Sequence, residues 1–92
     1  GSGLYILDEP EAALSPTRQM AVLSRLHQLV EGGSQFIIAA HSPILLSYPH
    51  ANIFYIENGK LIKTRYEETE HYLVTKDFLN NHRNIVNQLF EE

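Results

Sequence analysis

The residues best suited to chemistry lie where two short apolar runs of the sequence end. Asp8 and Glu9 directly follow the run from Leu4 to Leu7, and Glu11 comes two residues later. Three carboxylates this close together repel one another and lose hydration, unless a cation or a reacting group compensates them. An Asp can bind Mg²⁺ and the next carboxylate can polarise an attacking water, which is what a site for Mg²⁺ and ATP requires.

The second apolar run, from Phe36 to Ala40, ends in His41. If the two runs are neighbouring parallel strands, their carboxyl ends meet at the edge where open α/β sheets bind ligands. A His at this place can hydrogen-bond a phosphate oxygen or the attacking water. A polar strand end or a lone His is often only structural, but the pairing of Asp8 and Glu9 with His41 favours a functional site.

The segments that carry these residues predict an α/β fold. Neither apolar run alternates with polar residues, which is typical of parallel strands covered on both faces. Between the runs, Ser15 and Pro16 start a helix, apolar residues recur at helical spacing as far as Val30, and Gly32-Gly33 ends it. Strand, helix and strand form a βαβ unit.

Two turn signals follow the second strand. Ser42-Pro43 predicts a short helix that continues to Ser47. Asn58-Gly59 separates two strand-like runs, residues 52–57 and 60–65, and predicts a β-hairpin with a type I′ turn. We expect this hairpin to form the antiparallel edge of the same sheet.

The last third of the chain predicts a helical tail. The acidic stretch 66–70 is expected to be a solvated connection, because its charge density is high. Helical periodicity is present over residues 77–80 and again over 83–90.

Composition limits the classes of function. The 92 residues contain 7 basic and 11 acidic side chains, for a formal charge of −4, and no basic run could follow a phosphate backbone. The chain has no cysteine, which excludes disulfides and thiolate metal sites. No apolar stretch approaches the roughly 20 residues of a membrane span, and the first residues do not have the pattern of a signal peptide. We therefore expect a cytoplasmic protein.

Other chemistries fit the sequence less well. A Ser-His-Asp hydrolase built from Ser42, His41 and Asp8 is disfavoured, because adjacent residues after a strand point apart and no G-x-S-x-G motif occurs. No H-x-x-x-H or H-E-x-x-H spacing supports zinc, so Mg²⁺ delivered with a nucleotide is the better match. The other four histidines are expected to be surface or hydrogen-bonding residues: His27, His50, His71 and His82.

The order and spacing of these segments resemble the ABC-type ATPases, and among them the stand-alone ATPases whose Walker B segment reads DEPE. LYILDEP is similar to a Walker B segment, EAALSP to the D-loop that follows it, and FIIAAHSP to the strand that carries the switch histidine. The resemblance continues through YIENGKLIKTRYEETEHYLVTKDFLNN and so covers nearly the whole chain.

The resemblance implies a role for each of the three residues at the strand ends. Asp8 would be the Walker B ligand of Mg²⁺, Glu9 the catalytic carboxylate beside the attacking water, and His41 the switch histidine that senses the γ-phosphate. In the complete protein these residues would take part in ATP hydrolysis.

The resemblance also implies roles for the two loops. It places Ser15 and Ser42 among the cofactor-binding residues, and makes residues 13–16 a D-loop at the interface of two ATPase domains. Ser15 stands where the transporter-type D-loop commonly has Asp, which weakens the inference about communication across such an interface. Ser15 can still cap the helix.

The sequence contains no G-x-x-x-x-G-K-[ST] motif, no Q-loop and no LSGGQ-like signature. We therefore expect residues 1–92 to be the C-terminal portion of a P-loop NTPase-like ABC-type ATPase domain, without the Walker A part that binding of ATP and Mg²⁺ requires. By resemblance, the P-loop strand would lie between the His41 strand and the strand near residues 52–56.

This incomplete domain leads to expectations about partners. We expect no ATP hydrolysis by the fragment, and association with itself through exposed strand edges, which a monomeric mass at micromolar concentrations would contradict. Nucleic acid would be bound only through the full-length protein, since a DNA-associated role rests on the likeness of DEPE segments to chromosome-maintenance ATPases alone. The alternative is a non-catalytic interaction or dimerisation module with an ATPase-like fold.

Overall fold

The computed structural model describes residues 3–91, which form two compact units divided between Ala51 and Asn52. The first contains the residues singled out for chemistry, and the second contains the hairpin and the long helix.

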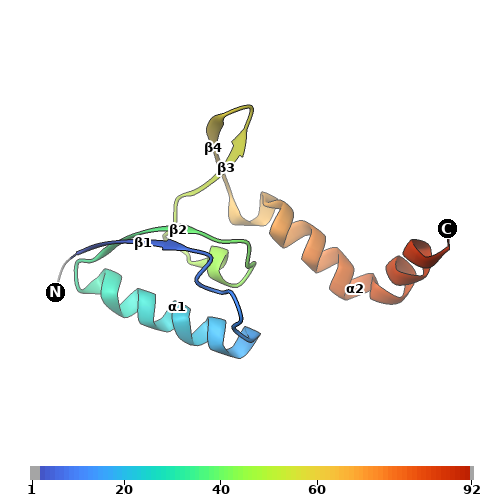
Figure 1. The fold of residues 1–92 in the computed structure, drawn as a ribbon, viewed down its shortest axis with the longest axis horizontal. Helices are drawn as coiled ribbons and strands as arrows, with labels where there is room; N and C mark the ends of the chain where they lie inside the picture. The colour runs from blue at the N-terminus through green and yellow to red at the C-terminus, as the bar shows by residue number, and fades with distance from the viewer. Residues whose placement is uncertain (1–2, 92) are drawn as a thin grey trace. The chain divides into compact units, whose positions relative to one another are not determined.

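The first unit is the expected βαβ arrangement. It consists of β1 (Leu4–Asp8), α1 (Pro16–Glu31), β2 (Gln35–Ala39) and the short 3₁₀ helix η1 (Leu45–Ser47). β1 and β2 pair in parallel, with Asp8 level with Ala39, and α1 runs along one face of the pair (Figure 1). The α/β class and the parallel pairing predicted from the sequence are confirmed.

Local signals explain where α1 begins and ends. The Ser15 hydroxyl accepts a hydrogen bond from the Arg18 N–H at 3.2 Å, and Pro16 occupies the first turn. At the other end, the N–H of Gly32 donates to the Gln28 carbonyl, and Gly33 adopts a φ of 100° that a side chain would disfavour. The helix therefore has the bounds that the sequence predicted.

The two faces of the β1–β2 pair differ in exposure. On one face Tyr5 stacks on Phe36, with ring centroids 5.1 Å apart. On the other face Ile6 and Ile37 are level with each other and remain 74% and 60% exposed. The prediction that both faces are covered is therefore wrong for the described residues, because the unit has only one long helix to cover two faces.

The predicted helix after Ser42-Pro43 is reduced to the single 3₁₀ turn η1. The Ser42 hydroxyl accepts hydrogen bonds from the N–H groups of Ile44 and Leu45, at 3.0 and 3.2 Å, so it organises this turn as a cap would.

The second unit opens with a hairpin of β3 (Ile53–Glu57) and β4 (Lys60–Thr64). Asn58 and Gly59 have φ values of 51° and 76°, as the two central positions of a type I′ turn require. The hairpin is a two-stranded sheet of its own in the described residues. Among the described residues β3 and β4 pair with each other, so the expected place of the hairpin at the edge of the β1–β2 sheet stays a prediction.

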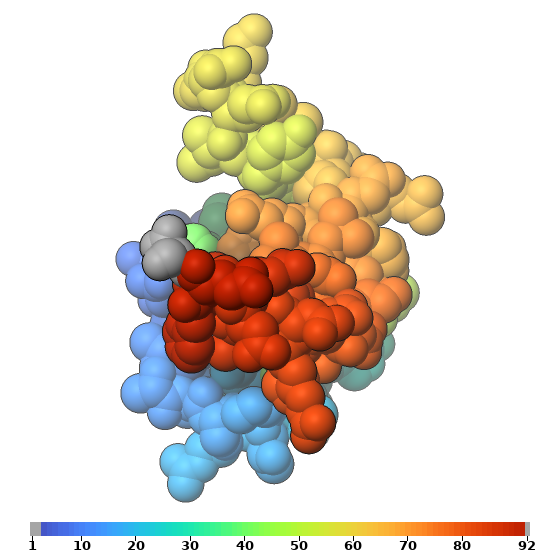
Figure 2. Space-filling model, turned by 90° about the vertical axis from the view of Figure 1, so that its right-hand side faces the viewer, coloured from blue at the N-terminus to red at the C-terminus, as the bar shows by residue number. Residues whose placement is uncertain are grey.

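The remainder of the second unit is η2 (Tyr66–Glu68) and α2 (Glu70–Phe90). The helix begins earlier than predicted, because the Thr69 hydroxyl caps it by accepting from the Tyr72 N–H at 3.2 Å. A kink interrupts α2 at Asn81, where the sequence periodicity also breaks. Figure 2 shows the side chains of α2 in orange to red, and three of its apolar ones are strongly exposed: Leu79, Leu89 and Phe90. No helix among residues 3–91 is both long and apolar enough to span a membrane.

Candidate functional site

The parallel pairing brings Glu9 and His41 together at one edge of the β1–β2 sheet. Asp8 is the last residue of β1 and is aligned with Ala39 at the end of β2. Just beyond these two residues, Oε1 of Glu9 lies 3.6 Å from Nε2 of His41. The sequence prediction that these strand ends meet is confirmed by this geometry.

The backbone of Glu9 adopts an unusual conformation. Its N–H donates to the Ala39 carbonyl at 2.7 Å, which extends the sheet hydrogen bonding one residue beyond β1. Its φ of 48° is in the left-handed region, which costs an ordinary residue about 1–2 kcal/mol. Such strained positions are concentrated at functional sites.

Glu9 and His41 are both accessible to a ligand. Their side chains are 55% and 69% exposed. An exposed pair at this distance adds little to stability, because solvent screens the charges. The two side chains can therefore exchange this contact for hydrogen bonds to a reactant with little loss of free energy. The carboxylate would act as an acceptor, and the imidazole as a donor or an acceptor.

Asp8 suits a magnesium ion better than a metal held by protein ligands alone. No group of three or more His, Asp or Glu side chains that could hold a metal occurs within residues 3–91. Mg²⁺ is commonly bound by only one or two carboxylates, with waters and substrate phosphates completing its shell. A single exposed carboxylate at the carboxyl end of β1 fits that pattern.

The two serines predicted to bind a cofactor have their hydroxyls engaged within the chain. Ser15 caps α1, as described above. Ser42 is only 6% exposed, and besides accepting from two backbone N–H groups it donates to Oε1 of Gln19. Their assignment to the cofactor stays a prediction.

The structure ties two further residues to this site: Glu11, which the sequence analysis treated only as one of three clustered carboxylates, and Gln19, which it did not single out. Oε2 of Glu11 accepts a hydrogen bond from the His41 N–H at 2.8 Å. Nε2 of Gln19 donates to the Leu14 carbonyl at 3.0 Å. The one signal for Glu11 was its place as third carboxylate of the DEPE segment, and Gln19 gave no signal apart from its position in the first turns of a helix.

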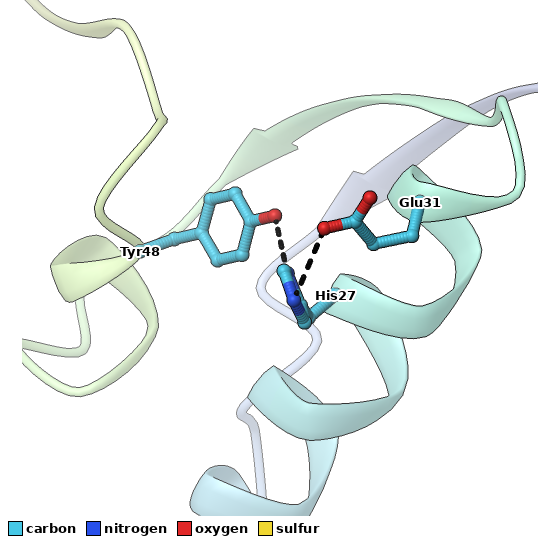
Figure 3. Close-up of polar contacts among 3 residues, drawn as sticks. All are labelled: His27, Glu31 and Tyr48. Carbon is cyan, nitrogen blue, oxygen red and sulfur yellow. Dashed lines mark hydrogen bonds and ion pairs between the residues drawn. The ribbon is translucent and has the colours of Figure 1, made fainter.

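A polar cluster holds the chain beyond η1 against α1 (Figure 3). Nδ1 of His27 lies 2.9 Å from the Tyr48 hydroxyl, and Nε2 of the same ring lies 3.4 Å from Oε1 of Glu31. If Glu31 is ionised it accepts from Nε2–H, and a neutral ring then accepts from the Tyr48 hydroxyl. The expectation that His27 is a hydrogen-bonding residue is thus confirmed.

Comparison with known proteins finds one matching family model and a relative that aligns with part of the chain. Residues 1–47 match the family model described as "AAA domain, putative AbiEii toxin, Type IV TA system". The chain is also 34% identical over 61 residues to a protein of Methanothermobacter thermautotrophicus named "Putative ABC transporter ATP-binding protein". That alignment covers 66% of this chain but 22% of the relative, so the chain spans less than a quarter of its length. The family match includes Asp8, Glu9 and His41.

Proposed function

The chain belongs to this AAA-domain family of ATPase-type AAA/ABC domains, and from that premise we propose that it supplies the acidic half of an ATP-hydrolysing site in a longer protein. In this proposal residues 1–92 are the C-terminal portion of the ATPase domain. The phosphate-binding residues would come from elsewhere in the protein, because the sequence has no P-loop motif.

The observation that carries the proposal is the pair of Glu9 and His41 at the carboxyl ends of two adjacent parallel strands, 3.6 Å apart. Phosphoryl transfer depends mainly on positioning and on stabilising charge. Glu9 would accept a hydrogen bond from the attacking water and orient it, and His41 would contact the γ-phosphate from the neighbouring strand end. The alignment of the two strands keeps both residues at one edge.

Asp8 would hold Mg²⁺ beside this pair. When bound, the ion neutralises the charge of the phosphates. Ser15 and Ser42 would act by shaping the loops on either side, since their hydroxyls already make hydrogen bonds within the chain. The proposed cofactors are therefore ATP and Mg²⁺, and the charged contact from this chain to the ion is Asp8.

The test is Glu9→Gln in the full-length protein. Glutamine keeps the size of the side chain but removes the negative charge that orients water. We expect nucleotide binding within about threefold of wild type and a turnover lower by about 10²- to 10³-fold, the usual effect of removing one preorganised electrostatic contact. Glu57→Gln, at an exposed position at the end of β3, is the matched control. Unchanged turnover in Glu9→Gln would remove Glu9 from this role.

A second candidate function is a non-catalytic interaction or dimerisation platform. The exposed apolar pair Ile6 and Ile37 favours it, because exposed apolar patches mark interaction sites. Sedimentation of the 92-residue chain at micromolar concentrations distinguishes self-association from a monomer. If the full-length protein shows no ATP hydrolysis and the chain is dimeric, this candidate replaces the first.

A further inference from the structure

We propose that Glu11 is a positioning residue that holds His41 through the main chain and couples it to the loop that follows Glu9. This inference rests on the proposed function and assigns a role to a carboxylate that would contact neither the metal nor the nucleotide. It applies to the loop of residues 9–15 and the segment of residues 40–45.

The central contact is a long-range hydrogen bond to a charged acceptor. Oε2 of Glu11 accepts from the His41 N–H at 2.8 Å, across 30 residues of sequence. Hydrogen bonds to ionised acceptors are shorter and stronger than bonds between neutral groups. The bond fixes the backbone of His41 two residues beyond Ala39, whose carbonyl accepts from the Glu9 N–H. Together the two bonds anchor the backbone that leads from β2 into His41, and so fix the point from which the imidazole projects.

A second connection joins the same two segments. Gln19 donates from Nε2 to the Leu14 carbonyl at 3.0 Å and accepts from the Ser42 hydroxyl through Oε1. The loop is thus bound to the His41 segment directly through Glu11 and, at Ser42, through Gln19. A displacement of residues 11–14 must move His41 and Ser42 with it or break one of these bonds.

The surroundings of Glu11 favour a positioning role over a purely stabilising one. Its second oxygen, Oε1, is buried and has no hydrogen-bond partner among residues 3–91. Leaving a buried acceptor unpaired is unfavourable. The side chain of His41 is exposed, and the bond from its N–H to Glu11 anchors its backbone to the loop. What Glu11 contributes is a fixed geometry for His41.

The test compares Glu11→Met with Glu11→Gln in the full-length protein. Methionine keeps the length of the side chain and removes the acceptor, while glutamine keeps an acceptor oxygen for the His41 N–H. We expect Glu11→Met to lower kcat by about tenfold or more with KM for ATP within about twofold, because misplacing a reactive group by about 1 Å can cost 10²-fold. Glu11→Gln should recover kcat to within about threefold of wild type, and Glu57→Met should have no effect.

Hydrogen exchange by mass spectrometry gives a readout that does not depend on ATP hydrolysis. The peptide that contains His41 should lose protection in Glu11→Met and keep it in Glu11→Gln, while protection of α1 shows that the protein is folded. If Glu11→Met does not fold, Gln19→Met breaks the second connection and should give the same split between kcat and KM. Unchanged exchange at His41, or lost protection with unchanged kcat, would overturn the inference. If wild type shows no hydrolysis, the proposed function fails and the catalytic role of Glu11 fails with it, whereas the exchange data separately decide whether the contact exists.

Discussion

The loop between β1 and α1 stores conformational strain that one substitution should release. Ala13 has a φ of 64°, in the left-handed region. The Cβ atom makes this conformation cost about 1–2 kcal/mol. Glycine lacks the Cβ but loses about 0.5–1 kcal/mol more conformational entropy on folding than alanine. The difference predicts that Ala13→Gly raises the free energy of unfolding by about 0.5–1 kcal/mol.

Ala12 provides a matched control for this prediction. It is adjacent to Ala13, it is not among the described residues with a positive φ, and its N–H donates to the Glu9 carbonyl at 3.0 Å. Ala12→Gly relieves no strain, so only the entropic cost remains and the free energy of unfolding should fall by about 0.5–1 kcal/mol. Replacing alanine by glycine is therefore expected to change the free energy of unfolding in opposite directions at these two neighbouring positions.

Thermal and urea unfolding followed by far-UV circular dichroism measures the contrast. For a domain of this size, 1 kcal/mol corresponds to a shift in Tm of about 4–8 °C. Hydrogen exchange at the Leu14 amide, which donates to the Glu11 carbonyl at 2.9 Å, reports the loop itself. If Ala13→Gly lowered the midpoint as much as Ala12→Gly does, the left-handed backbone would not be a source of strain and the reasoning would be refuted.

Two further predictions concern the second unit. Thr69→Val keeps the shape of the side chain but removes the hydroxyl that accepts from the Tyr72 N–H and donates to the Tyr66 carbonyl. It should therefore lower the free energy of unfolding by about 1–2 kcal/mol, and by more than Thr69→Ser does. Equal losses for the two variants in urea denaturation would contradict this. Burial raises the pKa of Tyr66 above its ordinary value of 10.0, and the charges of Tyr72 and Glu67 raise it further, so the folded state holds the phenolic proton more tightly than the unfolded state. The resulting stabilisation is complete below about pH 10 and is lost as the pH rises above this value through the folded pKa. Wild type should therefore lose stability relative to Tyr66→Phe only above about pH 10; a difference that is independent of pH there would count against it.

Local signals in the sequence were sufficient for much of the fold. Ser15 and Pro16 fixed the start of α1, because the cap and the preset φ act within four residues of the chain. Asn58-Gly59 defined the hairpin turn for the same reason. The break in periodicity near residue 81 corresponds to the kink, where Nδ2 of Asn81 binds the carbonyl and the carboxylate of Asp77.

The predictions that failed have two different causes. Coverage of both faces of the β1–β2 pair depends on tertiary packing, which the two apolar runs alone do not specify. The early start of α2 was missed because the acidic residues before it resemble a solvated connection, although Thr69 is a good N-cap.

The candidate site also contains one part that the sequence predicted and one part that it did not. Periodicity and strand ends led to Glu9 and His41, because parallel strands deliver their carboxyl ends to one edge. The hydrogen bond from the His41 N–H to Glu11 was not predictable, since it depends on how a loop folds back across 30 residues of sequence.

The βαβ unit also determines when the site is assembled. Glu9 and His41 are brought together by strand pairing and by backbone hydrogen bonds, and no ligand is needed for them to meet. In the proposed ATPase, a ligand that arrives at this edge would find these backbone positions preorganised, so that the entropy of ordering them is lost during folding instead of during binding. Under the same proposal, differences in affinity and specificity would come mainly from the region that contributes the phosphate-binding groups.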